Sequence, residues 1–348
     1  MSKADNPMLR KAQNWFIELR APFLTATLVS IILGTAIAWT RNSSFNSVFF
    51  ALALAGGLCA HLGTNIANDY FDHKSRNDEV NKEFVRPFSG GSRTIQQGLL
   101  TPKEVLGGSL LFFTVATSIG AYLILMNRPL VLALVLVGLV SGFFYTAPPL
   151  AWASKGIGEA IVGINFGALM TLGAYYVQTQ TLLLEPIVAS TPISLLILAV
   201  LYINEFPDYT ADKAVGKKTL VVRLGRGKAV LGYAAIVFSA YLSVFLSVLL
   251  GITPLYTLLA LIPLPLAAES VQHALKFHSE PFKLVPSNAS TIVLHLVTSL
   301  LLSLGYFLQG FTFASLEYFV VIVAVGICAL FTAGFYLKIR RACRQIGR

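Results

Sequence analysis

Long apolar stretches alternate with short polar segments along almost the whole chain. A helix that crosses a bilayer needs about 20 consecutive, predominantly apolar residues. The stretches reach this length and lack the narrow stripes of soluble amphipathic helices, so the pattern predicts an all-α, polytopic transmembrane bundle. Ten spans are expected, at residues 21–40, 46–68, 104–126, 129–147, 156–177, 190–206, 228–250, 254–275, 288–308 and 315–337.

Two of the polar connections are longer than the others, at residues 69–103 and 208–228. Each is too short to form an ordinary folded domain. They are expected to cap the bundle, one over its N-terminal half and one over its C-terminal half. The first 20 residues form a polar segment without the pattern of a removable signal peptide, and residues 338–348 form a basic tail.

The distribution of lysine and arginine predicts how the spans are oriented. With a cytoplasmic N-terminus and ten spans, 24 of the 26 basic residues fall on the cytoplasmic side, and only Arg41 and Arg128 fall outside. Cytoplasmic loops carry such an excess. Both termini and both long connections are therefore predicted to be cytoplasmic, in an integral membrane protein.

Composition agrees with a membrane protein and argues against other classes. The chain is 55% hydrophobic and 12% charged, with a mean hydropathy of +0.71, whereas a soluble domain has about 25% charged residues. The net charge of +10 flanks the apolar runs and forms no continuous basic stripe, so no nucleic-acid partner is expected. The three cysteines lack the spacing of a zinc site or a disulfide framework.

Acidic residues are concentrated in two motifs. Apart from Asp5, the chain's aspartates lie in Asn65-Ile66-Ala67-Asn68-Asp69-Tyr70-Phe71-Asp72 with the nearby Asp78, and in Asn204-Glu205-Phe206-Pro207-Asp208-Tyr209-Thr210-Ala211-Asp212. Each motif follows an apolar span at its predicted cytoplasmic end. On a helix, residues four apart share a face. This spacing relates Asn68 to Asp72, and Asn204 to Asp208 and Asp212, although Pro207 is expected to distort the second motif.

Paired acidic clusters beside basic residues are suited to binding a diphosphate. Magnesium prefers oxygen ligands and is commonly shared between carboxylates and substrate phosphates. Lysine and arginine neutralise the remaining phosphate oxygens. The alternative is that these acids only solvate helix ends, but two similar motifs on one side of the membrane favour a diphosphate site.

At these residues the chain resembles the UbiA superfamily of intramembrane aromatic prenyltransferases. The long gap before Asp78, with Arg76 at the place of the usual third acid, is similar to the 1,4-dihydroxy-2-naphthoate polyprenyltransferase branch of menaquinone biosynthesis. Further similar blocks support the resemblance. They are Arg20-Ala21-Pro22, Gly90-Gly91-Ser92-Arg93, Tyr145-Thr146-Ala147-Pro148-Pro149, Gly156-Ile157-Gly158-Glu159, Tyr175-Tyr176-Val177-Gln178 and Asp212-Lys213-Ala214-Val215-Gly216-Lys217.

The resemblance implies a nine-helix prenyltransferase core at residues 21–310, to which 315–337 adds a tenth helix. It implies magnesium-dependent transfer of a polyprenyl chain to an aromatic acceptor, with loss of diphosphate. In the naphthoate branch the acceptor also loses CO2, and the product is demethylmenaquinol. The implied metal ligands are Asp69, Asp72, Asp78, Asp208 and Asp212; Asp72, Asp208, Asp212, Arg93 and Lys217 are catalytic; Asn68, Asn204, Arg76, Lys213, Tyr145 and Tyr176 bind substrate.

Other functions remain compatible with the sequence. A related prenyltransferase would use 4-hydroxybenzoate, homogentisate or a lipid as acceptor. A secondary transporter would also have many spans and intramembrane acids, but it explains the two similar motifs less well. His61, one helical turn before the first motif, is expected to serve packing or a helix hydrogen bond rather than acceptor binding. The sequence gives no oligomeric state.

Overall fold

A computed structural model describes residues 7–310 of the chain, and within this range every regular element is helical. The α-helices are α1 (Pro7–Glu18), α2 (Thr25–Asn42), α3 (Ser47–Lys74), α4 (Asn77–Val80), α5 (Pro102–Leu125), α6 (Val131–Phe143), α7 (Gly158–Gly163), α8 (Met170–Thr179), α9 (Glu185–Ala214), α10 (Leu220–Leu224), α11 (Arg226–Leu249), α12 (Leu264–Phe277) and α13 (Val285–Gly310). Short 3-10 segments are η2 (Ala21–Leu24), η3 (Trp152–Ser154), η5 (Leu255–Leu261) and η6 (Pro281–Lys283), and η4 (Ile164–Leu169) is a π-helix.

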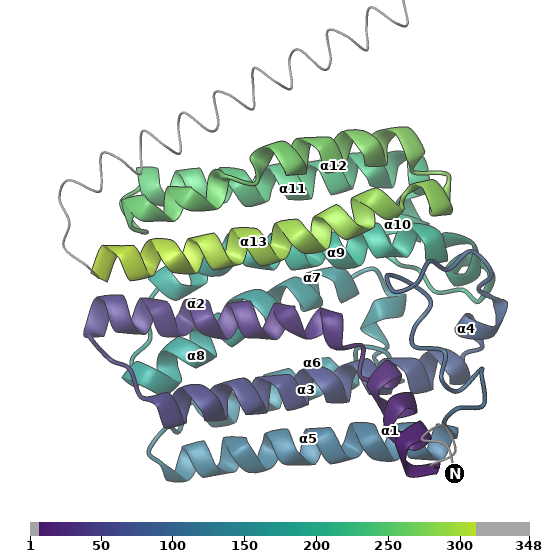
Figure 1. Cartoon of the computed structure of the whole chain (residues 1–348), viewed down its shortest axis with the longest axis horizontal. Coiled ribbons are helices and arrows are strands. Elements are labelled where there is room, and N and C mark those ends of the chain that lie inside the picture. The colour runs from purple at the N-terminus through teal and green to yellow at the C-terminus, as the bar shows by residue number, and fades with distance from the viewer. Residues whose placement is uncertain (1–6, 311–348) are drawn as a thin grey trace, which may run out of the picture.

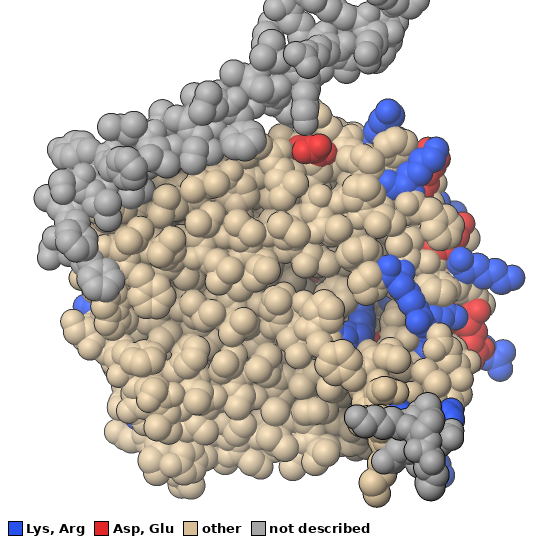
Figure 2. Space-filling view, viewed as in Figure 1, with Lys and Arg blue, Asp and Glu red and all other residues tan. Residues whose placement is uncertain are grey.

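The long helices lie side by side with their axes roughly parallel (Figure 1). Helix α3 packs against α5, α2 packs against α8 and α13, and α9 packs against α11. The short helices α4 and α10 lie together at one end of the bundle, which we call the polar end (residues 75–101 and 215–225). Figure 2 shows that most of the visible charged side chains gather at this end. The long sides of the bundle therefore present a surface suited to lipid.

The expected number of core spans is confirmed. Within residues 7–310, eight helical segments are long and apolar enough to cross a membrane, and Val131–Phe143 is a shorter apolar helix. Together they correspond to the nine core spans expected from the sequence. The chain is thus an integral membrane protein with an all-α fold. The expected tenth span at 315–337 and the tail at 338–348 lie outside the described residues.

Several expected boundaries were wrong. Helix α3 continues through the first acidic motif to Lys74, and α9 runs from Glu185 to Ala214 and so contains the whole second motif. The expected spans ended where charge begins, but helix hydrogen bonds continue past the apolar part. Pro207 lies inside α9 without ending it. Both motifs are therefore the last turns of membrane-spanning helices, rather than parts of the polar connections.

Small residues allow the helices to approach closely. A Cβ atom at Gly34 of α2 would lie 2.2 Å from the carbonyl oxygen of Thr171 in α8. Such close approach of backbones is typical of helix packing in membranes. Large apolar side chains such as Phe238 and Leu249 of α11 point outward, with exposed fractions of 67% and 69%. In a bilayer these side chains are solvated by lipid.

Candidate active site

The last turns of α3 present one polar face to a cavity of about 340 Å³. Asn68 and Asp72 both line this cavity. The Asn68 side-chain amide donates a hydrogen bond to Asp72 Oδ2 at 3.1 Å. The spacing of four residues thus places this pair on one face, as the sequence predicts.

Helix α9 presents the second acidic face to the same cavity. Asn204, Asp208 and Asp212 all line it, which confirms the expected common face. Asn204 is fixed from behind, because Asn288 of α13 donates a hydrogen bond to its Oδ1 at 2.8 Å. The two motifs therefore face each other across one space, although more than 130 residues separate Asp72 from Asp208 along the chain.

Amide groups from the connection after α3 hold the carboxylates of α9. The Asn77 side chain donates to Asp212 Oδ1 at 3.0 Å, and the Asn81 side chain donates to Asp208 Oδ1 at 2.6 Å. The backbone N–H of Gly90 lies 3.4 Å from Asp208 Oδ2. These neutral donors orient the carboxylates without cancelling their charge.

Lys217 places its ammonium group between the two motifs. Its Nζ lies 3.6 Å from Asp72 Oδ2 and 3.6 Å from Asp212 Oδ1. Burial alone would lower the pKa of Lys217, but Asp212 and Asp72 outweigh it and hold that pKa well above its usual value. Lys217 is therefore a permanent cation that joins the ends of α3 and α9.

Negative charge nevertheless exceeds positive charge in the cavity wall. The described acidic residues that line it are Asp72, Asp78, Glu205, Asp208 and Asp212, and the basic ones are Arg20 and Lys217. Burial, with smaller contributions from Asp72 and Asp69, raises the pKa of Asp78 to about 8. Lys217 and Arg93 oppose this rise without cancelling it, so the Asp78 carboxyl is mostly protonated near neutral pH, and a cation bound beside it would favour its ionised form.

The oxygen ligands of the site suit a magnesium ion that shares its coordination with substrate better than a metal ion coordinated by the protein alone. The available ligands are carboxylate and amide oxygens, which suit magnesium. Among the described residues, no three acidic, histidine or cysteine side chains converge closely enough to hold an ion by themselves. Magnesium usually keeps several waters and completes its shell with substrate phosphates. We call the acidic residues that line the cavity, Asp72, Asp78, Glu205, Asp208 and Asp212, the acidic wall. Their wide spacing agrees with an ion that is coordinated by both the protein and a diphosphate.

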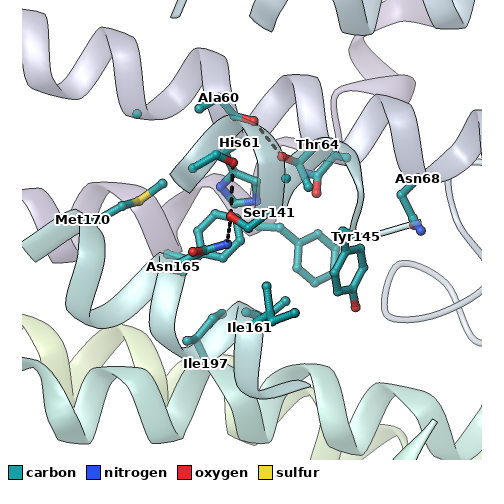
Figure 3. A pocket seen from close by; sticks show the side chains of 18 of the residues that line it. Ala60, His61, Thr64, Asn68, Ser141, Tyr145, Ile161, Asn165, Met170 and Ile197 are labelled. Atoms are coloured by element: carbon teal, nitrogen blue, oxygen red, sulfur yellow. Dashed lines mark hydrogen bonds between the residues drawn. The ribbon is translucent and has the colours of Figure 1, made fainter. Parts of the chain in front are cut away.

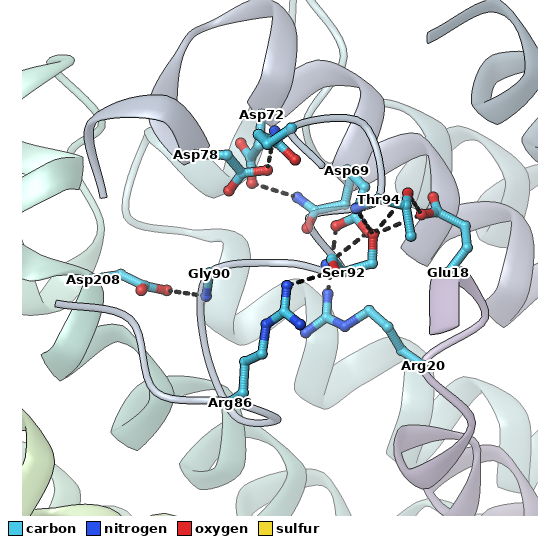
Figure 4. A network of polar contacts seen from close by, with 12 residues as sticks. Glu18, Arg20, Asp69, Asp72, Asp78, Arg86, Gly90, Ser92, Thr94 and Asp208 are labelled. Carbon is cyan, nitrogen blue, oxygen red and sulfur yellow. Dashed lines mark hydrogen bonds and ion pairs between the residues drawn. The ribbon is translucent and has the colours of Figure 1, made fainter. Parts of the chain in front are cut away.

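Asp69 lies behind this wall in a separate polar network (Figure 4). Its Oδ2 accepts a hydrogen bond from the Ser92 N–H at 3.0 Å, and its Oδ1 lies 3.8 Å from Arg20. Glu18, the last residue of α1, accepts hydrogen bonds from the hydroxyl groups of Ser92 and Thr94. Asp69 therefore anchors the connection after α3 and is not among the residues that line the cavity, and its place among the metal ligands stays a prediction.

Four other residues expected at the site do not line the cavity in the described structure. They are Arg93, Arg76, Lys213 and Tyr176. Arg93 stacks its guanidinium group 4.2 Å from the ring centre of Phe84. Arg76 is an exposed residue in the left-handed conformation that precedes α4, and Lys213 is exposed on the outer side of α9. Basic character alone does not specify which way these side chains point.

Tyr176 lies at the opposite end of the bundle. Its hydroxyl oxygen accepts a hydrogen bond from the Leu130 N–H at 3.3 Å, in the turn between α5 and α6. The side chain is 3% exposed and packs in an apolar cluster with Leu123 and Val131. Tyr176 therefore does not line the cavity, and its contact with substrate stays a prediction, whereas Tyr145 does line the cavity.

Several residues of the site were not predicted from the sequence. Asn77 and Asn81 are four residues apart, as are the members of the recognised motifs, and this spacing was the available signal. Glu205 lines the cavity beside Asn204. Asn65 also lines it, and its Nδ2 is buried without a hydrogen-bond partner in the structure. Both residues belong to the two recognised motifs, but neither was assigned a role in the site.

Known proteins resemble the chain over most of its length. It is 29% identical to the 1,4-dihydroxy-2-naphthoate octaprenyltransferase of Escherichia coli, over 86% of this chain and 97% of that protein. The corresponding enzyme of Haemophilus influenzae is 30% identical, over 85% and 96%. These similarities confirm the expected resemblance to the naphthoate branch.

Solved structures confirm the fold. A UbiA homolog from Archaeoglobus fulgidus bound to GPP and Mg2+ matches with a TM-score of 0.54 at 15% identity, covering 83% of this chain and 99% of that one. A digeranylgeranylglyceryl phosphate synthase structure matches with a TM-score of 0.52 at 17% identity, covering 86% and 98%. The model of the UbiA prenyltransferase family matches residues 27–285. The chain therefore belongs to the UbiA prenyltransferase family and is an intramembrane prenyltransferase.

Proposed function

We propose that this enzyme transfers a polyprenyl chain from its diphosphate to 1,4-dihydroxy-2-naphthoate, with loss of diphosphate and CO2, and so forms demethylmenaquinol. The observation that carries the proposal is the pair of acidic helix ends that Lys217 joins, facing one cavity that continues into an apolar interior. The relatives that bear the name of this naphthoate reaction support the choice of acceptor.

The residues that would hold magnesium are Asp72, Asp78, Asp208 and Asp212. When bound, the ion neutralises the diphosphate and stabilises the charge that develops as it leaves. Asn77 and Asn81 keep the α9 carboxylates in place through the hydrogen bonds described above. Asn68 and Asn204 border the same space and offer polar contacts to the donor.

Lys217 is suited to bind the leaving group directly. As the allylic C1–O bond breaks, both electrons go to the diphosphate, and a buried ammonium group lowers the energy of that charge. The allylic carbon then forms a bond with an electron-rich ring carbon of the acceptor. Loss of the carboxylate as CO2 returns an electron pair to the ring and restores its aromatic character.

The part of the cavity that lies beyond the acidic residues shields the reactive allylic carbon from water. Tyr145 lies beside the first motif and presents an aromatic ring to the cavity (Figure 3). Aromatic faces attract cations, and exclusion of water prevents hydrolysis of a reactive intermediate. The unpartnered Nδ2 of Asn65 is placed to donate a hydrogen bond to an acceptor oxygen.

We further propose that the polar end and both termini face the cytoplasm of a bacterial cell. The proposal rests on the basic residues, 24 of 26 of which fall on that side. The polyprenyl donor would then reach its site from the membrane, while its diphosphate remains at the cytoplasmic surface.

The test is turnover by the purified protein with magnesium, a polyprenyl diphosphate and a panel of acceptors. We expect a prenylated naphthoquinol, released CO2 and diphosphate in equal amounts with 1,4-dihydroxy-2-naphthoate. Transfer to 4-hydroxybenzoate, homogentisate or a glycerol phosphate lipid in preference to the naphthoate would overturn the choice of acceptor. Product masses from a mixture of acceptors measure this preference directly.

A further inference from the structure

Helix α1 lies across the polar end of the bundle instead of running along it. The long helices have roughly parallel axes, whereas the axis of α1 is steeply inclined to them (Figure 1). Because the long helices cross the membrane, this orientation brings α1 close to the membrane plane. A helix that lies in this plane can bury one side in lipid and bond to the protein with the other.

The level of α1 along the bundle is fixed by its contact with α5. The Trp15 ring packs against Gly108 of α5. Among the side chains of α5, Leu110 and Leu111 are the first large apolar ones with high exposure, at 48% and 62%. Since two residues of helix correspond to about 3 Å, α1 lies at the edge of the surface suited to lipid.

The outer side of α1 carries large apolar side chains. Met8, Leu9, Phe16 and Ile17 have exposed fractions of 83%, 48%, 67% and 45%. With about 3.6 residues per turn, Met8, Leu9 and Phe16 fall within an arc of about 100°, and Ile17 follows about 80° farther round the helix. The exposed Arg10 stands next to Ile17. An apolar side bordered by a basic residue is typical of a helix that binds an anionic lipid surface.

The inner side of α1 is bonded to the connection between α3 and α5. Glu18 accepts a hydrogen bond from the Ser92 hydroxyl at 2.6 Å and another from the Thr94 hydroxyl (Figure 4). The Asn14 side-chain amide donates to the Leu99 carbonyl oxygen at 3.1 Å. Helix α1 is therefore joined at two places to the segment that covers the polar end.

The same connection contacts both acidic motifs. The Ser92 N–H donates to Asp69 Oδ2 in α3 at 3.0 Å, and the Gly90 N–H lies 3.4 Å from Asp208 Oδ2 in α9. Ser92 thus bonds to Glu18 of α1 through its hydroxyl group and to the first motif through its backbone. A displacement of α1 would therefore pass through Ser92 to the segment that orients the carboxylates.

We propose that α1 is an interfacial helix that binds the anionic phospholipid surface at the polar end, and that this binding steadies the connection over the acidic site. The outer side of α1 continues the lipid-facing surface of α5, and Arg10 complements the phosphate of a lipid headgroup. Insertion of α1 into lipid is independent of the proposed function. Its effect on turnover rests on that function.

Insertion is measured without turnover, in a background in which Cys59, Cys328 and Cys343 are replaced by alanine. An environment-sensitive fluorophore is attached to Phe16→Cys or, as a control, to Lys82→Cys, which is exposed on the connection. The protein is placed in nanodiscs of phosphatidylglycerol with brominated or unbrominated acyl chains. We expect bromine to lower the emission from position 16 at least twofold and to leave that from position 82 unchanged.

The effect on turnover is measured in nanodiscs of phosphatidylcholine with and without phosphatidylglycerol. Phe16→Glu should lower kcat/KM at least threefold in the anionic nanodiscs. Phe282→Glu is the matched control, because Phe282 lies in η6 away from α1 and is 69% exposed, close to the 67% of Phe16. It should retain the wild-type value. Arg10→Gln should match wild type in phosphatidylcholine but lose the gain that phosphatidylglycerol gives.

The outcomes separate this inference from the proposed function. Equal quenching at positions 16 and 82, or none at 16, would overturn the interfacial placement of α1. Burial of the probe at position 16 only after addition of a soluble cell fraction would assign the apolar side to a protein partner and also overturn it. Equal kcat/KM in wild type and Phe16→Glu would overturn the link to the acidic site. Failure of the wild type to transfer any prenyl chain would refute the proposed function, while the quenching result would still decide where α1 lies.

Discussion

Asn77 donates a hydrogen bond to Asp212 across 3.0 Å, and so joins the segment that follows α3 to the last turns of α9. Both residues are almost fully buried, with exposed fractions of 4% and 1%. The contact fixes one carboxylate oxygen and leaves the other available. The geometry of the acidic wall thus depends on a neutral amide from a segment between the two motifs.

Asn77→Ala should weaken catalysis while leaving the bundle folded. Loss of a hydrogen bond to a charged group costs about 1.5–3 kcal/mol, so we expect kcat/KM to fall about 10- to 100-fold. Asn77→Asp should be at least as harmful, because it adds a negative charge beside Asp212. Steady-state turnover and the magnesium concentration needed for half-maximal rate would measure both effects. Unchanged kinetics in both variants would contradict a role for this contact.

Asp72→Asn and Asp208→Asn should each reduce turnover at least 100-fold, because each removes a charge that would balance magnesium. Neither carboxylate belongs to an apolar core cluster, so helix content measured by circular dichroism should be retained. Asp69→Asn serves as a contrast. Since Asp69 bonds to Ser92 and Arg20, its loss should lower thermal stability more than the affinity for magnesium. A larger effect of Asp69→Asn on the affinity for magnesium than on thermal stability would instead support Asp69 as a metal ligand.

Glu18 should make stability depend on pH. Burial and the nearby Asp69 raise the pKa of this carboxyl from 4.5 to about 7. The folded protein therefore binds more protons than the unfolded chain between these values, and its stability decreases as pH rises through this window, by up to about 3 kcal/mol. Glu18→Gln should show a smaller difference in Tm between pH 5 and pH 8 than wild type. Equal differences would contradict the shift.

Tyr176→Phe should have little effect on turnover. The hydroxyl group contacts the Leu130 N–H at the end away from the acids, so its loss should cost about 0.5–1.5 kcal/mol of stability. Tyr145→Leu, which removes an aromatic ring from the cavity wall, should reduce kcat without a matching loss of stability. Turnover together with thermal unfolding of the two variants would distinguish the two tyrosines.

Membrane orientation is testable by thiol labelling in a background in which Cys59, Cys328 and Cys343 are replaced by alanine. A cysteine at Lys82 should react with a reagent applied from the cytoplasmic side of intact vesicles. A cysteine at Asn127, in the turn between α5 and α6, should react only from the opposite side. The opposite pattern would reverse the proposed orientation.

The sequence predicted the core spans and the principal acidic face because both depend on short-range periodicity. Hydropathy places helices in the membrane, and a spacing of four places Asn204, Asp208 and Asp212 on one face. Helix ends were predicted less well, because charge marks the membrane surface rather than the last helical hydrogen bond. The motif did not show that Asp69 contacts Ser92 and Arg20, because residues next to one another on a helix point in different directions.

Long-range placement explains why other expected residues do not line the cavity. The roles of Arg93, Arg76 and Lys213 depended on loop conformation, which their charge does not reveal. Tyr176 was different, because the predicted orientation already placed the end of the fifth span on the side opposite to the acids. The block Tyr175-Tyr176-Val177-Gln178 resembles the family, but that resemblance does not show which end of the bundle the block occupies. Asn77 and Asn81 were missed because neutral amides are common in polar connections.

The excess of carboxylates over basic side chains in the cavity wall also affects how the substrate arrives and the product departs. A bare diphosphate would be repelled by this wall, whereas its magnesium complex would be attracted. The same repulsion acts on the diphosphate product if it loses its ion. If the enzyme uses magnesium as proposed, arrival and release of the two anions would be thermodynamically linked to the free magnesium concentration, and turnover would fall with that concentration even with abundant donor in the membrane.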